Sequence, residues 1–162
     1  GAGFTALDPI ETSTHENGNW GSSQHWFSSG ADKATPTLDF DLGGTFTVGT
    51  AHIWNWNGGE SGWGVKDFTL IFSQDATFGN GDDTSQTFTG MPEASMAADY
   101  TGEHFTLTPE AGVTNIRLQV VTPYGGSFTG LSEVRFSEAV PEPSTTALLG
   151  LGGLALILRR RK

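Results

Sequence analysis

Residues 66–72 read KDFTLIF, a stretch in which Phe68, Leu70 and Phe72 recur at a period of two. Successive side chains of a β-strand point to opposite faces, so these three are expected to share one face. The same period groups Leu38, Phe40 and Leu42; Phe105 and Leu107; Ile116, Leu118 and Val120; and Val134 and Phe136. Turn-forming residues separate the stretches at 43–44, 57–59, 79–83 and 125–126. Many short strands without intervening helices predict an all-β fold, an antiparallel β-sandwich or barrel.

Composition agrees with a sheet and limits the chain to one domain. The 162 residues include 23 Gly and 11 Phe, and no Cys. Once a C-terminal tail of about twenty residues is set aside, the remainder suits a single hydrophobic core. Because cysteine is missing, no disulfide, thiolate nucleophile or thiolate metal site can form, and packing must supply the stability. The first thirty or so residues show no period and are expected to wrap one end as loops.

Charge excludes several partners. The formal net charge is -10, yet four of the eight basic residues stand together at 159–162. Residues 1–139 hold 17 acidic and four basic side chains, a net charge of about -13. Such a field repels nucleic acid and anionic membrane. The sequence therefore predicts no nucleic-acid partner for the body of the chain.

The segment from Val140 to Lys162 has three parts in a fixed order. They are a proline-rich break, an apolar run over 147–158 and a basic cluster; the break is Pro141-Glu142-Pro143, and the cluster is Arg159, Arg160, Arg161 and Lys162. Proline ends a strand ladder, the apolar run can enter hydrocarbon, and the cations stay on the cytoplasmic side. At roughly 12 to 15 residues, the run is shorter than the ~20 that span a bilayer comfortably. The layout predicts a membrane-targeting helix, with a C-terminal core helix as the alternative.

This layout resembles the PEP-CTERM sorting signal of Gram-negative bacteria. The resemblance implies that an inner-membrane exosortase recognises the signal and cleaves near the Pro-Glu-Pro motif. It further implies delivery to the cell surface, the envelope or the extracellular polysaccharide matrix. Two units follow: a working domain over residues 1–139, and a sorting signal and membrane anchor over 140–162 that holds the protein in the membrane before processing.

The body of the chain carries a second resemblance. Four segments follow one another between His25 and Ser137: LDFDLGGTFTV, HIWNWN, GVKDFTLIFSQD and NIRLQVVTPYGGSFTGLSEVRFS. Their order and spacing resemble the discoidin-like β-sandwich, also called galactose-binding-domain-like or coagulation-factor C-type. The resemblance implies a jelly-roll sandwich that binds ligands in loops at one end. The N-terminal segment departs from the family's Asp-Gly loop before a Trp, for which only Trp20 or Trp26 could stand in.

A loop with the sequence WNGGESGW is the richest candidate for ligand binding. Flat apolar rings beside polar side chains suit a sugar, because the ring packs on the apolar face of a pyranose and polar groups bond its hydroxyls. We expect ligand contacts from Trp56, Asn57, Glu60 and Trp63 of this loop. Tyr124, which directly precedes the glycine-rich turn at 125–126, is expected to join them.

The alternative for these aromatic residues is packing. In HIWNW, strand alternation places His52, Trp54 and Trp56 on one face and Ile53 on the other, so some of the rings are expected to be core or to pack between loops. Exposed rings around a cleft would favour sugar binding. Burial of all five tryptophans would favour a purely structural role.

Calcium is the one cofactor that the discoidin resemblance suggests, as a structural ion with a late acidic ligand. Glu133 matches that ligand, and Asp8, Glu11 or Glu16 could supply the early acidic oxygens. Calcium takes about six to eight oxygen ligands, backbone carbonyls included. Residues 75–83, DATFGNGDD, also look calcium-like but lack the acidic spacing of an EF-hand, and a solvated turn is favoured there.

Catalytic patterns are not found in the sequence. The four histidines lack the i, i+4 spacing of a zinc helix, and no Gly-x-Ser-x-Gly elbow occurs. We therefore predict a non-catalytic, exported surface or matrix protein that binds carbohydrate through end loops. The alternatives are a structural matrix or biofilm protein without a specific small ligand and, less favoured, an envelope hydrolase.

Removal of the tail tests the division into two units. A protein ending at Ala139 should keep the thermal midpoint of the full chain, because no residue beyond the Pro141-Glu142-Pro143 break is expected to have a strand partner. Thermal unfolding followed by circular dichroism on both proteins checks this. A midpoint lowered by more than a few degrees would show that the tail packs on the domain.

Overall fold

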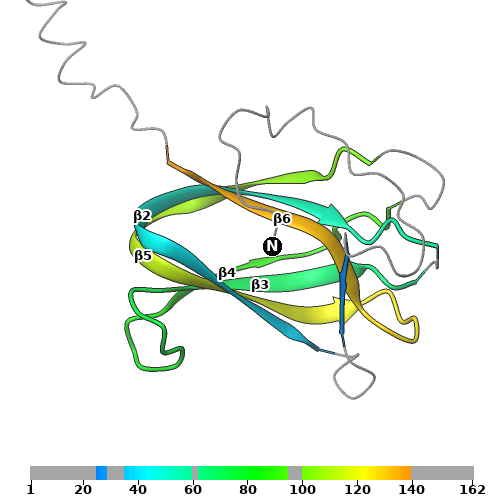
Figure 1. Cartoon of the computed structure of the whole chain (residues 1–162), viewed down its shortest axis with the longest axis horizontal. Coiled ribbons are helices and arrows are strands. Elements are labelled where there is room, and N and C mark those ends of the chain that lie inside the picture. Colours follow the sequence, from blue (N-terminus) through cyan, green and yellow to red (C-terminus); the bar gives the residue numbers. More distant parts are fainter. Residues whose placement is uncertain (1–24, 29–34, 60–61, 95–99, 140–162) are drawn as a thin grey trace, which may run out of the picture.

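The computed structural model describes residues 25–28, 35–59, 62–94 and 100–139. These residues form six strands and no helix, as Figure 1 shows. The strands are β1 (Trp26–Phe27), β2 (Thr37–Asn55), β3 (Val65–Ser73), β4 (Thr84–Phe88), β5 (Glu103–Pro123) and β6 (Gly130–Glu138). The all-β prediction is confirmed. The predicted sorting helix lies outside the described residues, within which no helix is long and apolar enough to cross a membrane.

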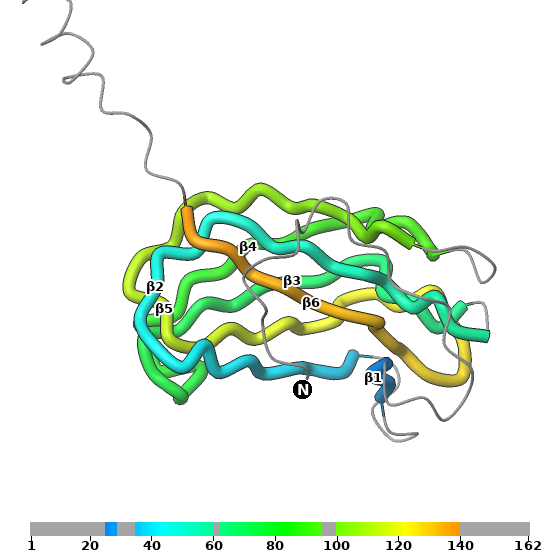
Figure 2. Tube along the Cα trace, turned by 45° about the horizontal axis from the view of Figure 1, so that its top comes forward, coloured from blue at the N-terminus to red at the C-terminus, as the bar shows by residue number. Residues whose placement is uncertain are grey.

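Two long strands build both layers of the sandwich. The 19-residue β2 and the 21-residue β5 pair antiparallel in one sheet of order β1-β6-β2-β5-β3-β4. Their ladder shifts register between Asp41 and Thr50, and both strands turn at the same end of the molecule (Figures 1 and 2). One layer therefore holds β6, the second half of β2 and the first half of β5. The other layer holds the first half of β2, the second half of β5, β3 and β4.

The bend in β2 corrects one sequence prediction. Gly43-Gly44 is expected to be a turn between two strands, but β2 runs through both residues without a break. Gly43 has φ +70° and Gly112, on the facing strand, has φ +78°. An L side chain rarely adopts this left-handed backbone. Irregular pairing of this kind bends a strand and strengthens its twist, which lets one strand serve two layers.

The core between the layers contains the residues that the period-two pattern predicts. Phe68, Leu70 and Phe72 of β3 are buried, as are Ile116, Leu118 and Val120 of β5. The core cluster also contains Leu107 and Phe136, with Leu38, Phe40, Leu42, Phe105 and Val134 packed against it. Phe68 contacts the Phe105 ring of the opposite layer at 5.1 Å between centroids, edge to face. The face assignments are confirmed.

Gln86 joins the edges of the two layers. It lies on β4, which pairs with β3, and faces the first half of β5, which pairs with β2. The Gln86 side-chain amide donates to the Thr108 carbonyl oxygen at 2.8 Å and accepts from the Thr108 N–H at 2.9 Å. This two-point contact imitates a strand partner, so it covers part of an edge that could otherwise pair with another chain.

The end of β6 lies at the bent end of the sandwich. Ala139 follows β6 and donates its N–H to the Thr47 carbonyl oxygen at 2.8 Å, beside the bend of β2. A Cβ on Gly49 would lie 2.5 Å from the Ala139 Cα. Glycine is therefore required where the end of β6 crosses β2.

Phe68→Ala tests the core assignment. Because the ring is buried and contacts both layers, its removal should cost about 3–5 kcal/mol of unfolding free energy. Urea denaturation measures the loss. Val121→Ala is the matched control, since Val121 is 49% exposed and its truncation should cost less than about 0.5 kcal/mol. Equal losses for the two variants would contradict the assignment.

Candidate functional site

Two connections and β1 meet at the end of the sandwich opposite the bend, here called the loop end. The β2–β3 connection covers residues 56–64 and the β5–β6 connection covers 124–129. Gly126 donates its N–H to the Gly62 carbonyl at 2.7 Å, and Gly130 donates to the Trp63 carbonyl at 2.6 Å. β1 is attached through Ser28, whose N–H donates to the Thr129 carbonyl at 2.8 Å. These backbone contacts fix the loops relative to one another.

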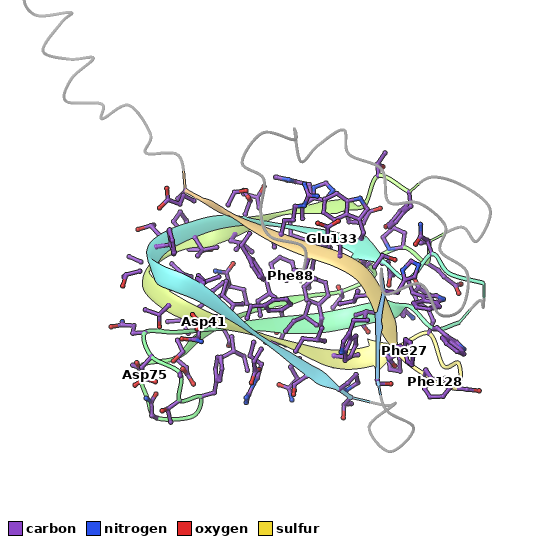
Figure 3. All side chains as sticks on the ribbon, viewed as in Figure 1. Phe27, Asp41, Asp75, Phe88, Phe128 and Glu133 are labelled. Carbon is purple, nitrogen blue, oxygen red and sulfur yellow. The ribbon has the colours of Figure 1, made fainter. Side chains whose placement is uncertain are left out.

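Four aromatic rings gather at the loop end and form what we call the aromatic cluster: Phe27, Trp56, Trp63 and Phe128. Centroid distances are 5.3 Å between Trp56 and Trp63, 4.8 Å between Trp63 and Phe128, and 6.0 Å between Phe27 and Phe128. Figure 3 shows Phe27 and Phe128 side by side at this end. Phe27 is 47% exposed. The cluster therefore has a buried base and one ring open to solvent.

The two indoles of the cluster form its base. Trp56 is 7% exposed and Trp63 is 6% exposed. Glycine backbone packs against both rings, since a Cβ on Gly58 would overlap Trp56 and one on Gly126 would overlap Trp63. Both rings, predicted as ligand contacts, are therefore buried rather than exposed around a cleft. The loops close on their own aromatic residues because adjacent glycines allow backbone to approach ring faces.

Asn57, also predicted as a ligand contact, is fully buried in a polar network. The Ser132 hydroxyl lies 2.8 Å from Asn57 Oδ1 and 3.0 Å from the Asn55 carbonyl oxygen, and accepts from the Asn57 N–H at 3.3 Å. His25 Nδ1 is 3.0 Å from the same hydroxyl. The Ser132 hydroxyl thus joins Asn55, Asn57 and His25 in one polar network.

Asn55, the last residue of β2, is a residue that the sequence analysis missed. It is fully buried, and its Nδ2 donates to the carbonyl oxygens of Val65 at 2.8 Å and Pro92 at 2.7 Å. Its Oδ1 accepts from the N–H groups of Val65 at 2.8 Å and Trp56 at 2.9 Å. One side chain thus connects β2, the start of β3 and the segment before residue 94. Its position within the apolar run HIWNW is the only sequence signal.

Tyr124 and Glu93 lie at the rim of the loop end. Tyr124 is half-buried, and its hydroxyl donates to the Met91 carbonyl oxygen at 2.7 Å. The exposed Glu93 accepts the Gly62 N–H with its carboxylate. Glu60, the remaining predicted contact, lies outside the described residues. Glu93 was also missed, because nothing in PEA (92–94) links it to a loop thirty residues earlier.

Glu133, the predicted calcium ligand, is engaged by a cation. Its Oε1 accepts from Arg135 Nε at 2.6 Å, and the Arg135 guanidinium lies 5.1 Å from the centroid of the Trp54 ring. The early acids Asp8, Glu11 and Glu16 fall outside the described residues. Within the part of the chain that the structure describes, no three acidic or histidine side chains form a metal-binding group. Calcium at Glu133 stays a prediction.

The turn at 75–83 folds as an internally bonded acidic turn. Asp75 Oδ1 accepts the Thr77 N–H at 2.6 Å, and Asp75 Oδ2 accepts from Asn80 Nδ2 at 3.1 Å. Asp83 accepts the Gly79 N–H. Side-chain acceptors that bind nearby backbone N–H groups are typical of turns. Figure 3 places Asp75 at the end of the molecule opposite Phe27.

Comparison of the sequence with protein families supports the interpretation of the tail. Residues 139–162 match the family model of the PEP-CTERM protein-sorting motif. The predicted sorting signal is confirmed, and it indicates an exported, surface-targeted protein. No curated protein matches the sequence.

Comparison with solved structures identifies the fold. An F5/8 type C domain from Bacteroides fragilis gives a TM-score of 0.54 at 16% identity, over 72% of this chain and 74% of that one. CBM32 of AlyQ, in complex with 4,5-unsaturated mannuronic acid, gives 0.50 at 17% identity, over 71% and 78%. CpGH89 from Clostridium perfringens, in complex with GlcNAc-alpha-1,4-galactose, gives 0.52 at 19% identity, over 73% of this chain but 12% of that one. The chain thus corresponds to a small part of that protein. The discoidin-like β-sandwich fold is confirmed.

Asn55→Ala tests the connecting role of the buried amide. The substitution leaves two N–H groups and two carbonyl oxygens without their partner, so the unfolding free energy should fall by about 3 kcal/mol or more. Chemical denaturation measures it. Asn80→Ala, in the exposed turn, is the control and should cost less than about 1 kcal/mol. A similar small loss at Asn55 would mean that water replaces the amide.

Proposed function

We propose that the domain is a non-catalytic carbohydrate-binding module of an exported surface protein, and that sugar binds at the loop end on the exposed ring of Phe27. The observation that carries the proposal is this ring, 47% exposed yet supported by a buried aromatic base. The fold shared with a carbohydrate-binding module supports it. The sorting motif supplies the location.

The geometry around Phe27 suits a pyranose ring. Phe27 meets Phe128 edge to face at 6.0 Å and Trp56 edge to face at 6.4 Å. It is held in register opposite Gly130 by the β1–β6 pairing. An aromatic ring fixed in this way loses little freedom when a ligand packs on it. Glu93 and the glycine backbone of the neighbouring turns supply polar groups for sugar hydroxyls.

The sorting signal supports a location of the module at the cell surface. We propose that exosortase processes the chain near Pro141-Glu142-Pro143, with the tail holding the protein in the membrane until then. Residues 1–139 are the working domain and 140–162 the signal. The location at the surface or in a polysaccharide matrix brings the module to glycans. The Ser132 hydroxyl at the loop end is part of the network with Asn55 and Asn57, and no reaction is assigned to it.

The second candidate is a structural matrix protein without a small ligand, and burial of Trp54, Trp56 and Trp63 favours it. Those rings contribute packing. Self-association through strand edges, however, is opposed by the Gln86 contact with Thr108, which covers part of the β5 edge. The exposed Phe27 ring is not explained by packing within the sandwich, and it favours the sugar-binding function.

Phe27→Ala separates the two candidates. Glycan-array screening of the full chain in mild detergent identifies a ligand, and calorimetry then measures affinity. We expect parent affinities of about millimolar to micromolar. Loss of the ring should weaken binding about tenfold and leave the thermal midpoint within about 2 °C, since an exposed ring contributes little to stability.

Trp63→Ala is the matched aromatic control. The ring is buried, so this variant should lose about 3–5 kcal/mol of stability whether or not sugar binds. A parent protein that binds no glycan, or a Phe27→Ala variant that binds as the parent does, would contradict the proposed function. The structural candidate would then replace it.

A further inference from the structure

We infer that the loop end selects neutral sugars and rejects anionic ones such as uronic, sialylated or sulfated glycans. This inference rests on the proposed function and adds the ligand's charge. The fold itself does not decide that charge, because a module of the same fold is in complex with an acidic sugar. The side chains at and around the loop end must decide it.

The first observation is the carboxylate at the rim. Glu93 is exposed, and its carboxylate accepts a hydrogen bond from the N–H of Gly62, the residue before Trp63. The Gly62 carbonyl oxygen in turn accepts from Gly126. The negative charge is therefore held against the β2–β3 connection, which carries Trp56 and Trp63 and is bonded to the β5–β6 connection. A fixed carboxylate accepts hydrogen bonds from sugar hydroxyls and repels a carboxylate or sulfate.

The second observation concerns the cations. Residues 1–139 contain four: Lys33, Lys66, Arg117 and Arg135. Arg117 makes a bidentate pair with Asp39 at 2.6 and 2.7 Å, and its hydrogen bond holds the pKa of that carboxyl below the usual value. Arg135 is paired with Glu133. Each guanidinium in the described part of the chain therefore already has a carboxylate partner, with which a ligand anion would have to compete.

The third observation is the overall field. Lys66 is exposed next to Asp67 in the sequence, and Lys33, outside the described residues, follows Asp32. The 17 acids of residues 1–139 outnumber the bases by about 13. At low ionic strength such a field lowers the local concentration of anions, and salt screens it over about 10 Å at 0.1 M. The Glu93 carboxylate and the net charge of residues 1–139 act in the same direction.

The test pairs each neutral glycan with its sialylated, sulfated or uronate counterpart on one array, probed with the full chain in mild detergent. We expect binding to neutral members and loss of binding when charge is added. Equal or stronger binding to charged counterparts would overturn this inference and leave carbohydrate binding in place. Binding to neither class would overturn the proposed function as well.

Glu93→Gln tests the rim carboxylate directly. Glutamine keeps an oxygen for the Gly62 N–H but removes the charge. Relative to the affinity for the neutral glycan, the affinity for a charged counterpart should rise about two- to fivefold at low salt, and this rise should vanish in high salt. Glu138→Gln, an exposed change of equal charge at the bent end, is the control and should change neither. An equal rise in both variants would assign the selection to net charge and overturn the role of Glu93.

Discussion

The side-chain amide of Asn55 is the interaction on which the loop end depends. Its two N–H donors and its acceptor oxygen bond backbone groups of Trp56, Val65 and Pro92, and the side chain is fully buried. A side-chain amide has two N–H donors and one acceptor oxygen, so it can bond two C=O and two N–H groups at once. Gly64 is part of the arrangement, because a Cβ there would lie 2.8 Å from Asn55 Oδ1. The amide thus sets where β2 ends and β3 begins, and with them the position of both buried indoles.

The core of the sandwich and its loop end are stabilised by different means. Between the layers, apolar side chains fill the space, and burial provides the driving force. At the loop end, buried polar groups such as Ser132 and Asn57 bond one another around aromatic rings. Fully satisfied polar networks specify one arrangement, since any displacement leaves a buried group unpaired. This rigidity lets an exposed ring such as Phe27 keep a defined place in a region built of loops.

Sequence reasoning reached the core because strand periodicity is local. Phe68, Leu70 and Phe72 share a face for reasons contained within seven residues. It failed at Gly43-Gly44, where a glycine pair that normally marks a turn instead bends a continuous strand, because the long β5 pairs across it. At the loop end, the indoles of Trp56 and Trp63 were expected as ligand contacts, but they form the buried base of the aromatic cluster. Phe27 and Glu93 could not be found, since each acquires its place through contacts with distant segments, Phe128 and Gly62.

The exit of the chain at the bent end gives the molecule a polarity. Ala139 leaves β6 beside Thr47, at the end of the sandwich away from Phe27, as Figures 1 and 3 show. A tether attached there would hold the domain by its bent end. The loop end would then point outward, at a distance set by the length of the long strands. A surface crowded with such molecules would then present a uniform outer layer of aromatic tips. Under the proposed function, neighbouring copies would bind one polysaccharide chain at several points, and many weak contacts together would give a high overall affinity.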